Sequence, residues 1–149
     1  KMEPVVFGYE KTMKTRYGVL SVREEGNVLL FKGKPVTPVI DGNASLSIVA
    51  SYELGKNDVF LLQDTGGASC PALYRFVTIN AAGLRASPVF GTCSDNIYPT
   101  SDSEKSVTVA MVGIVGNTSF YDANEKTPLK TVFYKYLNGQ VFENGKLMK

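Results

Sequence analysis

The chain contains no histidine and no tryptophan among its 149 residues. Without histidine, catalytic triads with an imidazole base, histidine-ligated zinc and an imidazole switch near neutral pH are all excluded. Nucleotide binding has no support either, because neither a Walker loop nor a GxGxxG motif occurs. A large share of enzyme mechanisms is thereby removed, and we expect a protein without catalytic residues, bound metal or cofactor.

Long apolar runs and a strong charge imbalance are absent as well. The segment VAMVGIVG at 109–116 is far shorter than the roughly 18 residues that a membrane-spanning helix needs, so we expect no membrane span. The net charge is only +2, and the densest basic stretch is the short segment EKTMKTR at 10–16. We therefore expect no nucleic-acid partner.

The sequence does contain many short runs of Val, Ile, Leu, Phe, Tyr and Thr, separated by Gly, Asn, Asp and Pro. This pattern is typical of strands and turns. It predicts an all-β fold of mainly antiparallel hairpins, in a compact sandwich or barrel that forms one domain over 1–149. Strands are predicted at 16–22, 27–36, 45–54, 58–64, 72–79, 84–90 and 106–115, and a last hairpin is predicted to turn at Asn138-Gly139.

Two of these segments support more specific predictions. The continuous apolar run DVFLLQD at 58–64 indicates a strand that is covered on both faces. Alternation in 72–79 predicts two faces, one with Leu73, Arg75, Val77 and Ile79 and the other with Tyr74, Phe76 and Thr78. Elsewhere we expect short helical pieces within 9–16 and 122–130, a flexible tail over 1–15 and a mobile polar loop at 94–105.

The two cysteines, Cys70 and Cys93, stand at the outer ends of the hairpin predicted from 72–79 and 84–90. They are almost equally far in sequence from a turn near 81–82, so antiparallel pairing places them opposite each other. A disulfide there closes a loop of about 24 residues and stabilises the fold by about 3–4 kcal/mol. Two free buried thiols and a catalytic or metal-binding role are the alternatives.

Disulfides persist in oxidising compartments, so the cysteine pair predicts a periplasmic or secreted protein. The chain begins at Lys1 and shows no export signal. We expect that the signal peptide of an exported precursor has been removed.

The loop that follows 58–64 is the candidate binding site. Its two glycines, Gly66 and Gly67, leave backbone amides uncovered, which allows a partner to approach closely. The alternative is that the glycines only form a turn at the end of the strand. Tyr74 is included among the candidate binding residues because tyrosine is enriched in protein interfaces. The predicted binding residues are Asp64, Thr65, Gly66, Gly67, Ser69, Tyr74 and Asp95. Because a phenol needs a hydrogen-bond partner, tyrosines are also expected near the surface among Tyr17, Tyr52, Tyr74, Tyr98, Tyr121, Tyr134 and Tyr136.

Carboxylates provide an enzymatic alternative. A pair of acids held at a suitable separation hydrolyses glycosides, and the candidates are Asp58, Asp64, Asp95 and Asp102. Acids at strand ends are more often turn formers.

The segments at 41–43 and 95–104 carry oxygen ligands without the spacing of a calcium loop, and the tripeptide NTS at 117–119 matches a glycosylation motif.

Three segments carry a resemblance, namely GNASLSIVASYELG at 42–55, DVFLLQDTGGASCPALYRFVTI at 58–79 and FGTCSD at 90–95. The patterns GGxxCPxxYxF at 66–76 and FGTCSD contribute most to it. Together they resemble a group of exported bacterial proteins that are mostly uncharacterised, over roughly 16–100. The resemblance implies an extracytoplasmic β-rich domain and no specific activity. GGASCPALY is also similar to the Ser/Gly loop ahead of a tyrosine in small periplasmic inhibitors of lysozyme-like hydrolases, although Cys70-Pro71 interrupts that pattern.

These features favour a non-enzymatic extracytoplasmic binding protein, an inhibitor or immunity-type protein that inserts a loop into the cleft of a partner hydrolase or toxin. One alternative is an envelope protein that binds cell-wall glycan or acts on carbohydrate with carboxylates. Another is a structural or antigenic surface protein.

Overall fold

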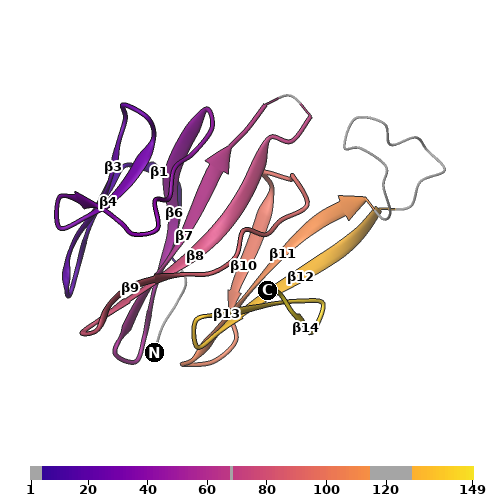
Figure 1. The fold of residues 1–149 in the computed structure, drawn as a ribbon. Helices are drawn as coiled ribbons and strands as arrows, with labels where there is room; N and C mark the ends of the chain where they lie inside the picture. Colours follow the sequence, from indigo (N-terminus) through magenta and orange to yellow (C-terminus); the bar gives the residue numbers. More distant parts are fainter. Residues whose placement is uncertain (1–4, 68, 115–128) are drawn as a thin grey trace.

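The computed structural model describes residues 5–67, 69–114 and 129–149, and these residues form three antiparallel sheets with no helix (Figure 1). The predicted all-β fold is therefore confirmed. Within these ranges, no helix is present that could cross a membrane.

The central sheet has the strand order β1-β6-β7-β8-β9. Its strands are β1 (Val5–Glu10), β6 (Ser45–Leu54), β7 (Asn57–Thr65), β8 (Ala72–Asn80) and β9 (Gly83–Ala86). The N-terminal sheet contains β2 (Thr12–Thr15), β3 (Gly18–Arg23), β4 (Val28–Phe31) and β5 (Lys34–Pro35). The C-terminal sheet contains β10 (Ile97–Ser101), β11 (Ser106–Ile114), β12 (Leu129–Leu137), β13 (Gln140–Glu143) and β14 (Lys146–Leu147).

The central sheet is covered on both faces, and the molecule is a three-layer sandwich (Figure 1). Along β7, Val59 and Leu61 pack with buried residues of the C-terminal sheet. Phe60 and Leu62 point the other way and pack with residues of the N-terminal sheet. The prediction that 58–64 is covered on both faces is confirmed, because successive side chains of a strand point to opposite faces.

The two faces predicted for β8 are also confirmed. Tyr74 and Phe76 belong to the core shared with the C-terminal sheet, whereas Val77 and Ile79 belong to the core shared with the N-terminal sheet. The predicted turn at Asn138-Gly139 joins β12 to β13, and both residues have positive φ angles of 55° and 87°.

Several predicted boundaries are wrong. The segment 27–36 is divided into β4 and β5, because Lys32 and Gly33 form a turn with positive φ angles. The strand predicted at 84–90 ends at Ala86, two residues before Pro88, which has no N–H for a ladder. The predicted loop at 94–105 contains β10, which pairs with β11.

Residues 5–15, predicted as a tail with a short helix, form β1 and β2 instead. The ammonium group of Lys11 ties this region to β6, since it donates to the Leu46 carbonyl at 2.6 Å and to the hydroxyls of Ser45 and Ser47 at 3.1 Å. The glycosylation motif at 117–119, Tyr121 and positions 122–128 of the second predicted helix lie outside the described residues.

Four of the tyrosines expected near the surface are buried, with at most 4% of each residue exposed: Tyr52, Tyr74, Tyr134 and Tyr136. The expectation that some of the seven tyrosines lie near the surface holds for Tyr98, which is 55% exposed. Three of the four buried phenols do not need the solvent, because they find hydrogen-bond partners within the protein. The Tyr134 hydroxyl donates to Glu143 Oε2 at 2.8 Å, and the hydroxyls of Tyr136 and Thr78 are 2.6 Å apart.

Candidate binding site

The tip of the β7–β8 hairpin, described at residues 66–67 and 69–71, is the centre of the candidate site. The ladder between the two strands ends at the pair Thr65 and Ala72. Beyond it, the Gly66 N–H donates to the Pro71 carbonyl at 2.9 Å, and the Cys70 N–H donates to the Gly67 carbonyl at 3.3 Å. These two bonds hold Gly66, Gly67, Cys70 and Pro71 together at the tip.

A disulfide connects this tip to the segment 91–96. Cys70 and Cys93 are bonded with their Cα atoms 4.7 Å apart, which confirms the predicted disulfide. The neighbouring Thr92 hydroxyl donates to the Val112 carbonyl of β11 at 2.9 Å. The segment 91–96 therefore joins the hairpin tip of the central sheet to the edge of the C-terminal sheet.

A third segment, residues 41–44, lies on the other side of the tip. The Asn43 N–H donates to Asp64 Oδ1 at 2.8 Å, and the Ala44 N–H donates to the Thr65 carbonyl at 2.8 Å. We call residues 41–44, 66–67, 69–71 and 91–96 together the stapled end of the sandwich. Backbone hydrogen bonds and one covalent bond thus hold three connections in place at this end.

The two glycines of the tip have different roles. A Cβ atom on Gly66 would lie 2.5 Å from the Cys70 carbonyl oxygen, so this position requires glycine for close approach of the backbone. A Cβ atom on Gly67 would meet nothing within 4 Å. Gly67 therefore tolerates a side chain, and a substitution there tests binding without disturbing the fold.

The structure separates the predicted binding residues into two groups. Gly67, Ser69 and Asp95 are exposed at the stapled end and are able to contact a partner. The other four residues build the frame that carries them: Asp64, Thr65, Gly66 and Tyr74.

Tyr74 was predicted as a contact residue, and its burial excludes that role, because only 1% of the residue is exposed. Its hydroxyl donates to the Ser94 carbonyl at 3.0 Å and lies 3.2 Å from Gln63 Oε1. Burial, together with the nearby charge of Asp95, raises the pKa of this phenol. Tyr74 therefore supports the segment 91–96 from the inside and remains neutral.

Sequence reasoning did not assign Asn43 or Asn96 to the site, although both lie in exposed loops rich in turn residues. The Asn96 side-chain amide donates to the Tyr98 hydroxyl at 2.9 Å, and Tyr98 is 55% exposed. These three side chains add hydrogen-bonding groups beside the residues that were predicted.

The carboxylates predicted for an enzymatic alternative do not all gather in one place. Asp58 is the second residue of β7 and Asp64 lies near the end of the strand, about 20 Å away at the rise of an extended strand. Asp58 is 7% exposed and is bound by Arg16. Asp102 accepts hydrogen bonds from the hydroxyls of Ser106 and Thr108. Asp58 and Asp64 are therefore too far apart for glycoside hydrolysis.

Metal ligands do not converge either within the described ranges, where no group of three or more Cys, Asp or Glu side chains is placed to hold an ion. The segments 41–43 and 95–104, which carry oxygen ligands in the sequence, instead supply the turn at Asn43 and strand β10.

A second surface lies on the outer face of the C-terminal sheet. Tyr98 and Phe133 stand in register across Ala110, and Phe133 is 49% exposed. A hollow of about 600 Å³ adjoins Phe133 and is also lined by Thr108, Lys135, Leu137, Phe142, Asn144 and Gly145. We call this the aromatic face. Exposed apolar patches of this kind mark interaction sites.

In comparisons with known proteins, no family model, no curated protein and no solved structure matches the chain. The resemblance to exported bacterial proteins and to periplasmic inhibitors therefore stays a prediction.

Proposed function

We propose that the protein is an extracytoplasmic binding protein of the inhibitor or immunity type, whose stapled end contacts a partner hydrolase or toxin. The observation that supports this function is the hairpin tip, which exposes Gly67 and Ser69 and is held by two backbone hydrogen bonds and a disulfide. A partner binds such a loop at a lower entropic cost than a free segment, because the loop is already ordered around its contact residues.

The location outside the cytoplasm is part of the same proposal. The Cys70–Cys93 disulfide cross-links the hairpin tip to the segment 91–96. Such a bond persists in the periplasm or outside the cell, where the compartment is oxidising.

Affinity capture tests the proposal. The oxidised protein, the double variant Gly67→Trp/Ser69→Trp and a matched control, Ala81→Trp/Ala82→Trp, are each used to capture proteins from an envelope extract and from culture supernatant. Ala81 and Ala82 are exposed at the opposite end of β8, and the change in size is similar. All three proteins should have similar thermal midpoints, because a Cβ on Gly67 meets no neighbour.

We expect a hydrolase or toxin that binds near-stoichiometrically to the wild type and the control, is lost with the tip variant, and is inhibited by the wild type in solution. A partner that the tip variant still binds with full affinity would remove the stapled end from the function. Capture of no protein by any of the three would count against a protein partner.

The aromatic face favours a second candidate function, which is binding of cell-envelope glycan. Its exposed Phe133 lies beside Lys135, Thr108 and Asn144, so an apolar ring is surrounded by side chains that form hydrogen bonds. Sites for small polar ligands commonly combine these two kinds of group.

Sedimentation with purified cell-wall sacculi tests this candidate. Phe133→Ala is expected to weaken binding about tenfold, as for the loss of an aromatic contact of about 1.4 kcal/mol. Val112→Ala is the control, because Val112 is 41% exposed and offers no ring. Equal weakening by both variants would reject the role of the Phe133 ring, and no sedimentation of the wild type would reject glycan binding.

A further inference from the structure

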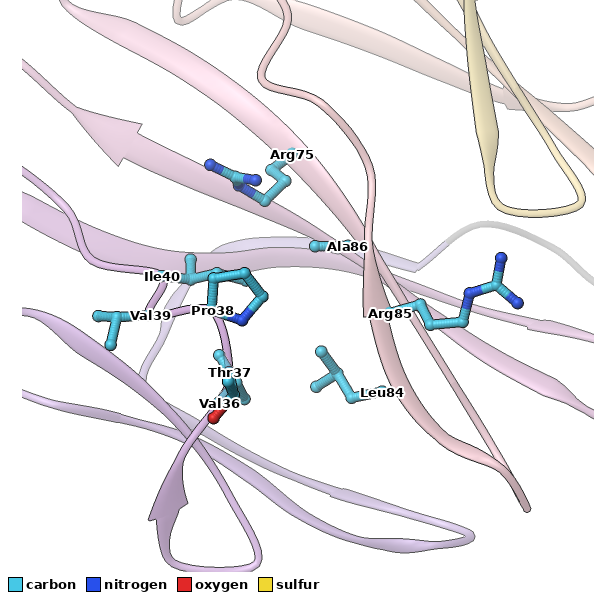
Figure 2. A pocket seen from close by; sticks show the side chains of 9 residues that line it. All are labelled: Val36, Thr37, Pro38, Val39, Ile40, Arg75, Leu84, Arg85 and Ala86. Carbon is cyan, nitrogen blue, oxygen red and sulfur yellow. The ribbon is translucent and has the colours of Figure 1, made fainter. Parts of the chain in front are cut away.

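A groove runs along β9, at the open edge of the central sheet. Residues 36–40 form one wall, Leu84 and Ala86 form the other, and the space between them is about 350 Å³ (Figure 2). Arg75 of β8 lies at one end, whereas Arg85 points away from residues 36–40. Among the described residues, the lining of the groove includes these two arginines and no Asp or Glu.

The wall formed by β9 carries open backbone groups. Among the described strands, β9 pairs with β8 alone. In this ladder Arg85 lies opposite Thr78, and just beyond the strand the Ser87 N–H donates to the Phe76 carbonyl at 2.9 Å. In an antiparallel pair, residues whose backbone groups bond to the neighbouring strand alternate with residues whose N–H and C=O groups point away from it. Leu84 and Ala86, which also line the groove, therefore direct their N–H and C=O groups away from β8, at the edge of the sheet.

Arg75 supplies a positive charge at the end of this wall. Its Nη1 donates to the Ser87 carbonyl at 3.1 Å, which holds the half-buried guanidinium against the chain that continues β9. The nearby carboxylate Asp64 accepts the Asn43 N–H. A guanidinium has five N–H donors, so most of those on Arg75 remain for an incoming carboxylate.

We infer that this groove binds an extended segment of a partner protein, which adds to β9 as a further strand and places an Asp or Glu side chain against Arg75. A protein segment fits better than a free anion, because the outward groups of Leu84 and Ala86 need hydrogen-bond partners at the spacing of a strand. Val39, which is 62% exposed, provides apolar contact on the opposite wall. Pro88 has no N–H, so the added strand is short.

This inference concerns residues outside the hairpin tip and holds whether or not the stapled end binds a hydrolase or toxin. Displayed random peptides are selected on the Gly67→Trp/Ser69→Trp variant, in which the tip is blocked, and the affinity of an enriched synthetic peptide is then measured by fluorescence anisotropy. We expect enriched peptides to carry one acidic residue within an alternating apolar segment.

The variants separate the two parts of the interaction. Arg75→Gln removes the charge, and Ala86→Pro removes an outward N–H without removing a bond to β8. Each should raise the Kd about tenfold, which corresponds to a charge-assisted or backbone hydrogen bond of about 1.4 kcal/mol. Arg85→Gln is the matched control, because it removes the same charge from the opposite face, and the Kd should change less than about twofold.

A peptide that is methylated on its backbone nitrogens should also fail to bind, and this measurement requires no change in the protein. Selection of no peptide, or full affinity for either Arg75→Gln or Ala86→Pro, would overturn the inference. Dependence on Arg75 together with full binding of the methylated peptide would likewise overturn strand addition.

Discussion

Arg16 holds the carboxylate of Asp58 with three nitrogen atoms: its backbone N and Nε at 2.7 Å and its Nη2 at 2.6 Å. Arg16 lies in the β2–β3 turn of the N-terminal sheet, and Asp58 lies at the start of β7 in the central sheet. The pair therefore fastens one layer of the sandwich to the next, at the end of β7 opposite the hairpin tip.

Asp58→Asn is expected to lower the free energy of unfolding by about 2 kcal/mol, because hydrogen bonds to a charged and nearly buried group are lost. Urea denaturation measures the change. Glu53→Gln is the control: Glu53 also contacts Arg16, at 2.9 Å, but half of its side chain is exposed, so the loss should stay below about 0.5 kcal/mol. Equal effects of the two variants would contradict the fastening role of Asp58.

Gly66→Ala should destabilise the protein by about 2 kcal/mol or more, because the new methyl group would lie 2.5 Å from the Cys70 carbonyl oxygen and the tip would have to shift. Gly67→Ala has open space around it and should leave the thermal midpoint unchanged. Thermal unfolding of both variants checks the difference. A neutral Gly66→Ala would show that the close approach at the tip is not required.

The fold could be predicted where a local pattern decides it. The alternation in β8 assigned its two faces correctly, because a strand between two layers buries both sets of side chains and the period of two is intrinsic to its backbone. The prediction of helix at β2 is wrong, because the Lys and Thr residues at 11–15 show no strand pattern. This strand forms through its pairing with β3 and through the hydrogen bond from Lys11 to the Leu46 carbonyl of β6.

The buried tyrosines and part of the candidate site could not be read from the sequence, because they depend on contacts between distant residues. The partner of the Tyr136 hydroxyl is Thr78, on another sheet. Asn43 is held at the stapled end by Asp64, 21 residues further along the chain. The cysteine pair could be predicted, because Cys70 and Cys93 flank a single hairpin.

Tyr52→Phe should leave the free energy of unfolding unchanged or raise it by up to about 1 kcal/mol. The Tyr52 hydroxyl is buried and, within the described residues, has no hydrogen-bond partner. Folding therefore removes its hydrogen bonds to water without replacing them, and the Phe variant avoids this cost in free energy. Tyr136→Phe is the matched comparison and should cost about 1 kcal/mol, because it leaves the Thr78 hydroxyl without its partner. Chemical denaturation of both variants tests this order, and the reverse order would contradict it.

Alkaline pH should unfold the protein. Burial raises the pKa of four tyrosines above the ordinary value of about 10: Tyr52, Tyr74, Tyr134 and Tyr136. The unfolded chain releases these protons from about pH 10, whereas the folded chain retains them, so stability is fully present below about pH 10 and falls as the pH rises further.

Denaturant unfolding over a pH series, followed together with tyrosinate absorbance, measures this effect. The four buried phenols should ionise only as the fold is lost, and Tyr136→Phe should remove one of these ionisations. Ionisation of all the tyrosines near pH 10 in a protein that is still folded would contradict the burial.

Removing the disulfide should destabilise the fold and release the hairpin tip. The double variant Cys70→Ser/Cys93→Ser is expected to lose about 3–4 kcal/mol of unfolding free energy, since the unfolded chain regains the freedom of a closed loop of about 24 residues. The segments around residues 70 and 93 should also become the first sites of limited proteolysis. Without the disulfide, the tip is held by its own hydrogen bonds and is no longer connected to residues 91–96, which bind β11.

Urea denaturation with and without reductant provides the control: reductant should shift the midpoint of the wild type to that of the double variant and leave the variant unchanged. If the oxidised wild type and the double variant share one midpoint, the disulfide contributes nothing to stability, and the stapled end is held by its backbone hydrogen bonds alone.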